Sequence, residues 1–327
     1  MSTPLPRVTV CVCTYRRPEG LRALLDGLAA QRFDAIEPPE LDVVVVDNEG
    51  SEAARAACQD FRARSATPLS YRHEPQVGIS YARNACLEQL SADCEFFAMI
   101  DDDEVPEPGW LESLLVAQRA TGADAVQGCV VPVFPESAPG WVRGLGLFGW
   151  PLREPGSPSP ERNDLQPLDL AATNNVLVRT AAVRELGLRF DPRLAQSGGE
   201  DTVFFGTLQE EGARIVYALG ARAHERVPAE RARLSYLLRV EFRKGFDRLR
   251  LKLFARQKPR SLRKRLRVRA RICGQGLAWL GTGLLSLPAS LASGSAFRER
   301  AADGLLCLAR GLGMLASALG VRYQHYR

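Results

Sequence analysis

Four consecutive acidic residues, Asp101, Asp102, Asp103 and Glu104, follow directly on the apolar run Phe96–Ile100. Adjacent carboxylates repel one another unless a cation lies among them. Carboxylate oxygens suit magnesium or manganese, which complete their coordination shells with water and substrate phosphates. We therefore expect a divalent-cation site here. The alternative is an acidic helix start, in which these residues favour the dipole of a helix beginning at Trp110.

A second acidic pair, Glu200 and Asp201, follows two glycines and opens a helical pattern. Aspartate at a helix start is often only a cap. Glycines also let backbone and substrate approach closely, and two adjacent acids provide one group to ionise and one to orient it. The motif alone therefore leaves a cap and a general base as alternatives.

The elements that must position these residues alternate between strands and helices. Apolar runs predict strands at 8–14, 41–46, 69–73, 96–100 and 125–133, and helical patterns fall at 18–28, 51–64, 80–89 and 110–121. This alternation predicts an α/β fold with a mostly parallel sheet flanked by helices. Ligands of such sheets bind outside the carboxyl ends of the strands. Polar residues follow three of the predicted strands there: Thr14-Tyr15-Arg16, Asp47-Asn48 and the acidic run.

The combination of motifs is more specific than any one of them. The order VTVCVCTYRR, VVVVDNEGS, VGISYARN, DDDE and GGED resembles the family 2 glycosyltransferases of the GT-A fold, over about residues 7–230. It is most similar to the bacterial branch that builds exopolysaccharide repeat units on a lipid carrier, of the succinoglycan glucosyltransferase type. The resemblance implies a nucleotide-sugar donor, a divalent cation (manganese or magnesium) and an inverting transfer to a hydroxyl of a lipid-linked saccharide.

The resemblance also implies roles for individual residues. Asp201 is the expected catalytic base, and Glu200 is expected to orient it. Asp103 is the direct metal ligand of the DxD pair, and His224 matches a position that completes the metal or diphosphate site in some relatives, although a lone histidine is often structural. The expected donor-binding residues are Thr14, Tyr15, Arg16, Asp47, Arg83, Asp101 and Asp102.

Two departures from the family pattern bear on substrate and product. The frequent Asp-Gly-Ser or Asp-Asp-Gly after the second strand is here Asp47-Asn48-Glu49-Gly50-Ser51, which bears on the choice of base. The QxxRW motif of processive synthases does not follow, which argues against a polymerising enzyme. Residues 135–170, rich in proline and glycine, are expected to form a long loop that closes over the sugar.

The chain changes character after about residue 230, so we expect a GT-A catalytic domain at 1–230 and a basic, helical region at 231–327. The segment Leu234–Leu253 has an amphipathic pattern, nine Lys or Arg and no acid fall between Arg256 and Arg271, and 26 uncharged residues follow. These features predict peripheral or monotopic docking on an anionic membrane, at the cytoplasmic face of the inner membrane. Within this region a shallow re-entrant hairpin is favoured over two full spans, and a soluble helical extension that packs on the catalytic domain is the alternative.

Other classes of protein are favoured less. A basic scaffold that binds nucleic acid or lipid without catalysis is one rival, but the basic segment has no interleaved aromatic residues and no nucleic-acid module is recognisable. A nucleotidyltransferase would need a glycine-rich, lysine-bearing phosphate loop, which is absent. The eight scattered cysteines form no CxxC pair and predict buried free thiols in a reducing compartment. The oligomeric state, the sugar and the linkage do not follow from the sequence.

Overall fold

The structure, a computed structural model, describes residues 5–148, 163–254, 261–291 and 297–321. The chain divides into two compact units, and each unit is built from two segments of the chain. The first unit contains the described parts of Met1–Val131 and Arg162–Glu225. The second contains the described parts of Pro132–Glu161 and Arg226–His325.

An eight-stranded sheet in the order β3-β2-β1-β4-β7-β6-β8-β5 organises the first unit. Its neighbours are parallel from β3 to β4, whereas β4–β7, β6–β7 and β5–β8 pair antiparallel. The sheet is therefore parallel where strands alternate with helices along the chain and mixed beyond β4. The strands are β1 (Arg7–Thr14), β2 (Glu40–Asp47), β3 (Leu69–His73), β4 (Phe96–Asp101), β5 (Glu104–Pro106), β6 (Ala125–Val133), β7 (Asn175–Arg179) and β8 (Ile215–Arg226).

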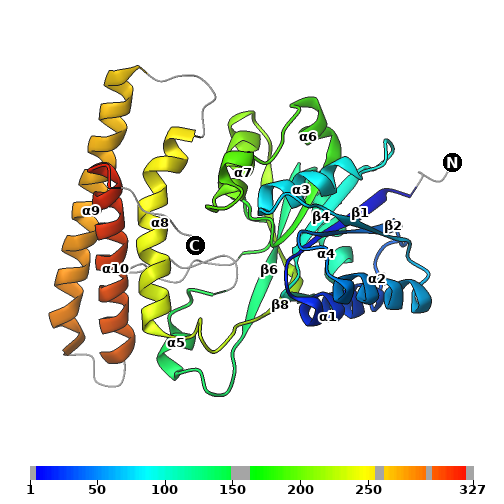
Figure 1. Cartoon of the computed structure of the whole chain (residues 1–327), viewed down its shortest axis with the longest axis horizontal. Helices are drawn as coiled ribbons and strands as arrows, with labels where there is room; N and C mark the ends of the chain where they lie inside the picture. Colours follow the sequence, from blue (N-terminus) through cyan, green and yellow to red (C-terminus); the bar gives the residue numbers. More distant parts are fainter. Residues whose placement is uncertain (1–4, 149–162, 255–260, 292–296, 322–327) are drawn as a thin grey trace. The chain divides into compact units, whose positions relative to one another are not determined.

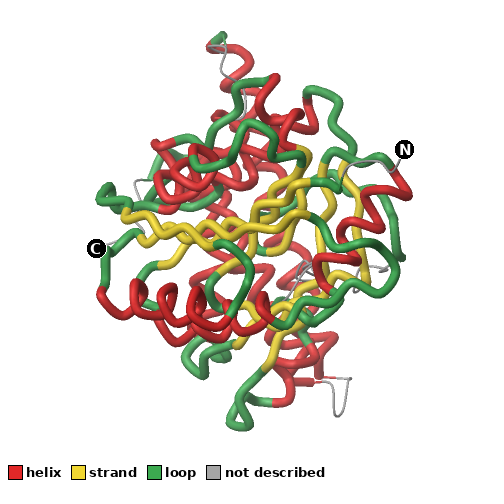
Figure 2. Tube along the Cα trace, turned by 90° about the vertical axis from the view of Figure 1, so that its right-hand side faces the viewer, coloured by secondary structure: helices red, strands yellow, loops and turns green. Residues whose placement is uncertain are grey.

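Helices cover both faces of this sheet, as the alternating pattern predicts (Figure 1 and Figure 2). Side chains along a strand point alternately to the two faces. Accordingly Val8, Val10 and Val12 of β1 pack into the cluster shared with the first group of helices, and Cys11 packs into the cluster of the second group. The first group is α1 (Pro18–Ala29), α2 (Glu52–Arg64) and α4 (Trp110–Thr121); the second is α3 (Ile79–Glu88), α6 (Thr180–Glu185) and α7 (Glu200–Glu210).

The strongly periodic segments fold as predicted. The predicted bounds of β3, β6 and α4 are confirmed residue for residue, and Ser51 caps α2 by accepting a hydrogen bond from the N–H of Ala54 (3.2 Å). The short strand β5 and the helix α6 were not predicted. All eight cysteines are free, and six of them are buried.

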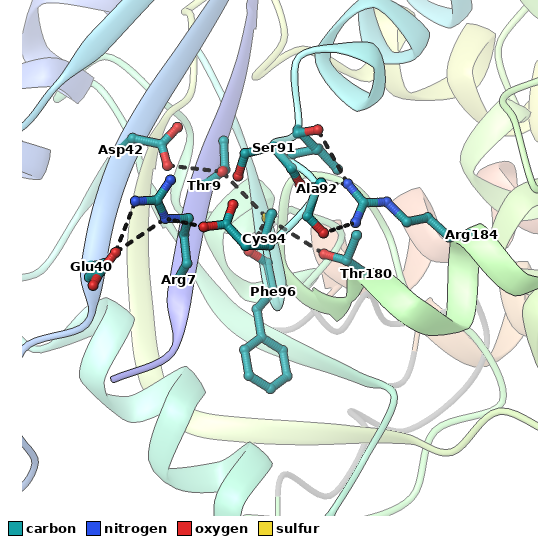
Figure 3. A network of polar contacts seen from close by, with 12 residues as sticks. Arg7, Thr9, Glu40, Asp42, Ser91, Ala92, Cys94, Phe96, Thr180 and Arg184 are labelled. Carbon is teal, nitrogen blue, oxygen red and sulfur yellow. Dashed lines mark hydrogen bonds and ion pairs between the residues drawn. The ribbon is translucent and has the colours of Figure 1, made fainter. Parts of the chain in front are cut away.

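Polar contacts tie the strands together at the amino ends of β1, β2 and β4 (Figure 3). Arg7 donates to Glu40 (2.9 Å), and Thr9 donates to Asp42 (3.1 Å). The Arg184 guanidinium donates to three carbonyls of the turn before β4, at Leu90, Ser91 and Ala92. These contacts lie at the end of the strands opposite to the acidic run, so they stabilise the sheet without occupying its carboxyl edge.

Helices dominate the second unit: α5 (Gly140–Gly144), α8 (Leu234–Phe254), α9 (Leu262–Leu291) and α10 (Phe297–Ala318). Helix α10 packs against both α8 and α9, as Figure 1 shows, whereas α8 and α9 contact each other much less. Of the expected loop at 135–170, residues 149–162 lie outside the described part of the chain.

The expected amphipathic face of α8 serves a different purpose from the one predicted. Leu237 and Leu249 are buried, at 4% exposed each, in clusters with residues of α9 and α10. Glycines let α8 and α10 approach each other closely, because a Cβ at Gly245 of α8 or Gly313 of α10 would collide with the backbone of the other helix. The expectation that this face of α8 lies in a membrane interface is therefore wrong: it is used within the unit.

A charged pair is buried among these helices. The Arg310 guanidinium of α10 donates to Glu241 of α8 (Nε to Oε2, 2.6 Å), stacks over the Trp279 ring of α9 at 4.8 Å, and is 5% exposed. The charge of Arg310 is thus neutralised inside the unit. Within the described residues, α10 is the one helix long and apolar enough to cross a membrane by length and composition, and half of its most apolar window is buried.

Candidate active site

The carboxyl ends of β1, β2 and β4 bring three of the predicted site residues to one edge of the sheet. Thr14 of β1 is in register with Asp47 of β2, and Cys13 of β1 is in register with Asp101 of β4. Neighbouring strands lie about 4.8 Å apart, so the polar residues that follow them are neighbours in space. The predicted clustering of the strand ends is confirmed.

Asp102 fastens the acidic run to the end of β1. It is 4% exposed and accepts hydrogen bonds from Thr14 Oγ1 (2.8 Å) and the N–H of Tyr15 (3.4 Å). One nitrogen of Arg17 donates to Asp102 at 2.8 Å and to Asp103 at 2.9 Å. Burial raises the pKa of Asp102, and Arg17 opposes that shift by stabilising the carboxylate. Arg17 was not predicted as a site residue. Its position between a polar strand end and Pro18 was the feature that could have identified it.

Asp101 lies beside Arg83 and retains access to solvent. Its side chain is 40% exposed and lies 3.6 Å from an Arg83 nitrogen. Loss of hydration, together with repulsion from Asp103 and Asp102, raises the pKa of Asp101 to about 7, against the pull of Arg83. Asp101 therefore loses its proton less readily than an aspartate in water.

This group of neighbouring carboxyl groups fits a divalent cation. The residues offer carboxylate oxygens, the ligands that magnesium and manganese prefer. Within the described residues, no group of three or more His, Cys, Asp or Glu side chains converges as a metal site. A cation here would therefore take its other ligands from water and substrate phosphates, which is the usual arrangement for magnesium in phosphate-binding sites.

Arg83 of α3 joins the acidic run to α7. Its guanidinium forms an ion pair with Glu200, lies 5.7 Å from the centre of the Phe190 ring, and belongs to a residue only 7% exposed. Burial opposes its charge, but the carboxylates of Glu200, Asp101 and Asp201 raise the pKa of Arg83. Burial raises the pKa of Glu200, with Arg83 acting against that shift, and Glu200 Oε2 is buried without a hydrogen-bond partner.

Asp201 stands at the start of α7, after two residues that require glycine. Gly198 and Gly199 have φ angles of 75° and 85°, which other residues seldom adopt. The Asp201 carboxylate accepts from the N–H of Thr202 (2.6 Å) in the first turn of α7 and is less buried than Glu200. Among the hydrogen bonds of the described residues, none joins Glu200 to Asp201. Glu200 therefore acts on Asp201 through its charge and through its place in the same turn of α7, not through a hydrogen bond.

Asp47 and Asn48 shape the turn after β2. Asp47, 1% exposed, accepts from the N–H groups of Glu49 (2.9 Å) and Ser51 (2.7 Å) and from the Tyr71 hydroxyl (2.9 Å). Asn48, which was not predicted as a site residue, donates to two carbonyls of the 74–76 segment and accepts from the N–H of Gly78 at the start of α3 (2.7 Å). The two residues thereby fix the helix that carries Arg83.

Tyr15 and Arg16 form the exposed part of this edge. Tyr15 is 40% exposed, and the Arg16 guanidinium lies 4.9 Å from the centre of its ring and pairs with Glu49 at 2.9 Å. Arg16 has a φ of 59°, an unusual conformation for a residue with a Cβ. Such conformations are often held at ligand sites. A flat aromatic surface beside a cation suits a nucleobase with a phosphate tail.

His224 is engaged elsewhere on the edge. It sits on β8 opposite Val105 of β5, and its Nε2 lies 2.7 Å from Glu107 Oε1. Glu104, one residue earlier on β5, is 2% exposed and accepts from Asn174 (3.1 Å), and burial raises the pKa of Glu104 well above its usual range. Because Glu107 occupies Nε2, a metal-binding role for His224 would fall to Nδ1.

The structure thus separates the predicted residues into two groups. The side chains with access to solvent are those of Tyr15, Arg16, Asp101, Asp103 and Asp201. The buried ones, which hold the first group in place, are Thr14, Asp47, Arg83, Asp102 and Glu200.

Comparison with known proteins agrees with this geometry. The family model described as Glycosyl transferase family 2 matches residues 9–187. The chain is 39% identical over 238 residues to the succinoglycan biosynthesis protein ExoM of Rhizobium meliloti (strain 1021), covering 73% of this chain and 72% of that protein. It is 28% identical to the glucosyl-dolichyl phosphate glucuronosyltransferase of Haloferax volcanii, covering 74% and 76%.

Solved structures show the same fold at lower identity. The mannosyltransferase PcManGT from Pyrobaculum calidifontis, solved in complex with GDP-Man and Mn²⁺, superposes with a TM-score of 0.61 at 18% identity and covers 94% of this chain and 86% of that one. The expected GT-A fold is confirmed.

Proposed function

The chain belongs to glycosyl transferase family 2 and is a glycosyltransferase; from this premise we propose that it transfers a sugar from a nucleotide donor, a uridine diphospho-sugar, with inversion at the anomeric carbon. The acceptor is a hydroxyl of a lipid-linked saccharide. The observation that supports this proposal best is the meeting of Tyr15, the acidic run and the Arg83–Glu200 pair at one edge of the sheet.

The proposed chemistry is a single displacement. The acceptor oxygen attacks the anomeric carbon, the bond from that carbon to the diphosphate breaks, and the hydroxyl proton passes to Asp201, whose carboxylate is more accessible than that of Glu200. Glu200 and Arg83 keep α7 in place beside the acidic run. Tyr15 and Arg16 contact the nucleotide, on the wall that Thr14, Asp47 and Asp102 shape from behind.

A divalent cation fits the acidic run, where Asp103 and Asp101 would hold it. When bound, it would neutralise the charge that develops on the leaving diphosphate. Arg17 donates to Asp103 at 2.9 Å, so this arginine positions the carboxylate and shares its charge.

We place the reaction at the cytoplasmic face of the inner membrane. Two relatives support a reaction at a membrane: one takes part in succinoglycan biosynthesis, and the other is named for glucosyl-dolichyl phosphate, a lipid-linked sugar. In this proposal residues 1–230 carry the catalysis and residues 231–327 dock on the membrane.

The proposal is tested by incubating the full chain with a panel of uridine and guanosine diphospho-sugars, with manganese and after treatment with a chelator. We expect one uridine donor to be hydrolysed slowly in the presence of the metal, and faster transfer when a lipid-linked saccharide is added. The matched control is Asp26→Asn, which alters a carboxylate of α1 that is 60% exposed and pairs with Arg64. Metal-independent turnover, or no turnover of any donor with any lipid-linked saccharide, would contradict the proposal.

A further inference from the structure

The outer face of α9 carries large apolar side chains that no other part of the described chain covers. Leu277, Leu284 and Leu285 are 59%, 62% and 76% exposed. The opposite face of the same helix is buried: Ile272 is 0% exposed, and a Cβ at Gly276 or Gly283 would crowd the backbone of α10. The helix is therefore packed on one side only.

A basic segment precedes this leucine face on the same helix. It consists of six exposed cations in the first turns of α9, with no acid among residues 261–271: Arg263, Lys264, Arg265, Arg267, Arg269 and Arg271. From residue 272 to residue 297 there is no charged residue at all. Cations therefore occur on the exposed surface of α9 up to Arg271, together with Leu262 and Leu266, and none occurs beyond Arg271 on this helix.

Three of these cations, Arg263, Arg267 and Arg271, lie on the same side of α9 as the leucines. Arg267 and Leu285 are eighteen residues apart, which is five full turns of an α-helix and about 27 Å. Gly274 and Ala278, between them, are also exposed on this side, so the uncharged surface is continuous. The apolar face of α8 is used inside the unit, as described above, and does not compete for this role.

We propose that the outer face of α9 is the surface that docks on an anionic lipid leaflet, with α9 lying in the plane of the interface. This inference rests on the proposed function, in which the acceptor is lipid-linked. A bilayer offers both chemistries that the face displays: phosphates for the basic segment and acyl chains for the leucines. A nucleic acid would satisfy the cations and leave the leucines in water, and the α9 of a second copy would offer these cations no acidic residue.

The experiment is flotation of the full chain with vesicles of phosphatidylcholine, alone or mixed with phosphatidylglycerol, at low and high salt. We expect binding to the mixed vesicles that weakens with salt. The triple variant Arg263→Gln, Arg267→Gln, Arg271→Gln should weaken that binding by about fivefold per cation, or about a hundredfold in all. The double variant Leu277→Glu, Leu285→Glu should weaken it at both salt concentrations.

Controls separate docking from folding and from catalysis. Leu186→Glu changes a leucine that is 43% exposed in the first unit and should leave vesicle binding unchanged. Because all of the substituted side chains are exposed, the variants should unfold at the temperature of the parent chain and should hydrolyse the donor normally without vesicles. Failure of donor hydrolysis in the parent chain would count against the proposed reaction, not against this surface.

Two results would overturn the inference. One is vesicle binding that both α9 variants retain in full. The other is a loss of self-association or of DNA binding in these variants while vesicle binding is unchanged, which would assign the face to a second copy or to nucleic acid.

Discussion

Replacing Arg83 by glutamine removes the cation that joins α3 to α7. The parent guanidinium is ion-paired with Glu200 in a place where the two side chains are 9% and 7% exposed, and it lies 3.6 Å from Asp101. Arg83→Gln leaves the Glu200 carboxylate buried without its partner. Breaking a buried pair in this way costs about 3–5 kcal/mol. Protonation of Glu200 relieves part of that cost, because burial already raises its pKa, so we expect a loss of about 3 kcal/mol.

The interaction itself is measured by a double-mutant cycle. Glu200→Gln leaves Arg83 with Asp101 as a neighbouring carboxylate, so it should cost less than Arg83→Gln. The double variant should be more stable than the sum of the single effects by about 2 kcal/mol, within the range seen for contacting residues. The matched control is Arg179→Gln, because the Arg179 side chain, paired with Asp124, is 42% exposed and should contribute no more than about 1 kcal/mol.

Urea unfolding measures the loss of stability. Hydrogen exchange of the α3 and α7 amides shows whether that loss falls in the first unit. Additive effects, within about 0.5 kcal/mol, would refute the reasoning, since they would show that the guanidinium and the carboxylate do not depend on each other. So would equal losses for Arg83→Gln and Arg179→Gln. Arg83→Gln should lower the turnover rate more than the affinity for the donor, because Arg83 is buried behind the residues proposed to contact the donor.

Four further predictions concern the reaction and the acidic run. Asp103→Ala should abolish metal-dependent turnover of the donor and leave the melting temperature unchanged or higher, because it relieves repulsion among carboxylates. Asp201→Asn should retain donor binding and lose turnover by about 10²–10⁴-fold, because an amide cannot accept the proton. Gly20→Ala should reduce turnover, since its Cβ would collide with the main chain of the acidic run, whereas Gly206→Ala, which meets open space, should not. Asp101→Asn should stabilise the metal-free chain by about 1 kcal/mol at pH 8 and have no such effect at pH 4, after allowance for the exposure of this side chain.

The sign of the last prediction follows from the direction of the shift. The folded-state pKa of Asp101, about 7, lies above its ordinary value of 3.8. The folded state therefore binds the proton more tightly, and the stability that this supplies is lost as the pH rises between these two values. Thermal melts without metal across this range measure the effect.

Each of these predictions has a contrary outcome. Turnover by Asp103→Ala in the presence of a chelator would remove the cation from the reaction. Near-full activity of Asp201→Asn would transfer the role of base to another group, with Glu200 the first candidate. Equal activity of the two glycine variants would show that the acidic run tolerates movement, and a pH-independent effect of Asp101→Asn would show that this carboxyl group is not perturbed.

The sequence predicts those parts of the molecule that local periodicity determines. The runs that became β1, β2 and β4 are apolar along their length because helices cover both faces of the sheet. Their polar ends therefore stood out, and Thr14, Asp47 and Asp101 could be placed at one edge. The recurring motif order then supplied the family, which no single motif could have done.

The sequence pattern could not identify contacts between residues that lie far apart along the chain. Strand β5 is three residues long and exists because it pairs with β8, more than a hundred residues later. The position of Arg83 on a helix gave no sign that its partner is Glu200, 117 residues away. Arg17 reads locally as a residue before a helix, and only the folded chain places it against Asp102 and Asp103. The amphipathic pattern of α8 predicted an apolar face correctly but could not tell whether lipid or another helix covers it.

The interleaving of the two units determines how this enzyme can be divided. Part of the second unit comes from the middle of the chain: Val142 packs with Val227, and Leu145 packs with Leu306 of α10. A single cut near residue 230 would therefore strand the 132–148 segment without its partners and expose its apolar side chains. Grafting the helical unit onto another catalytic domain requires moving two segments together, so an exchange of one contiguous stretch, by recombination or by design, should yield an insoluble protein.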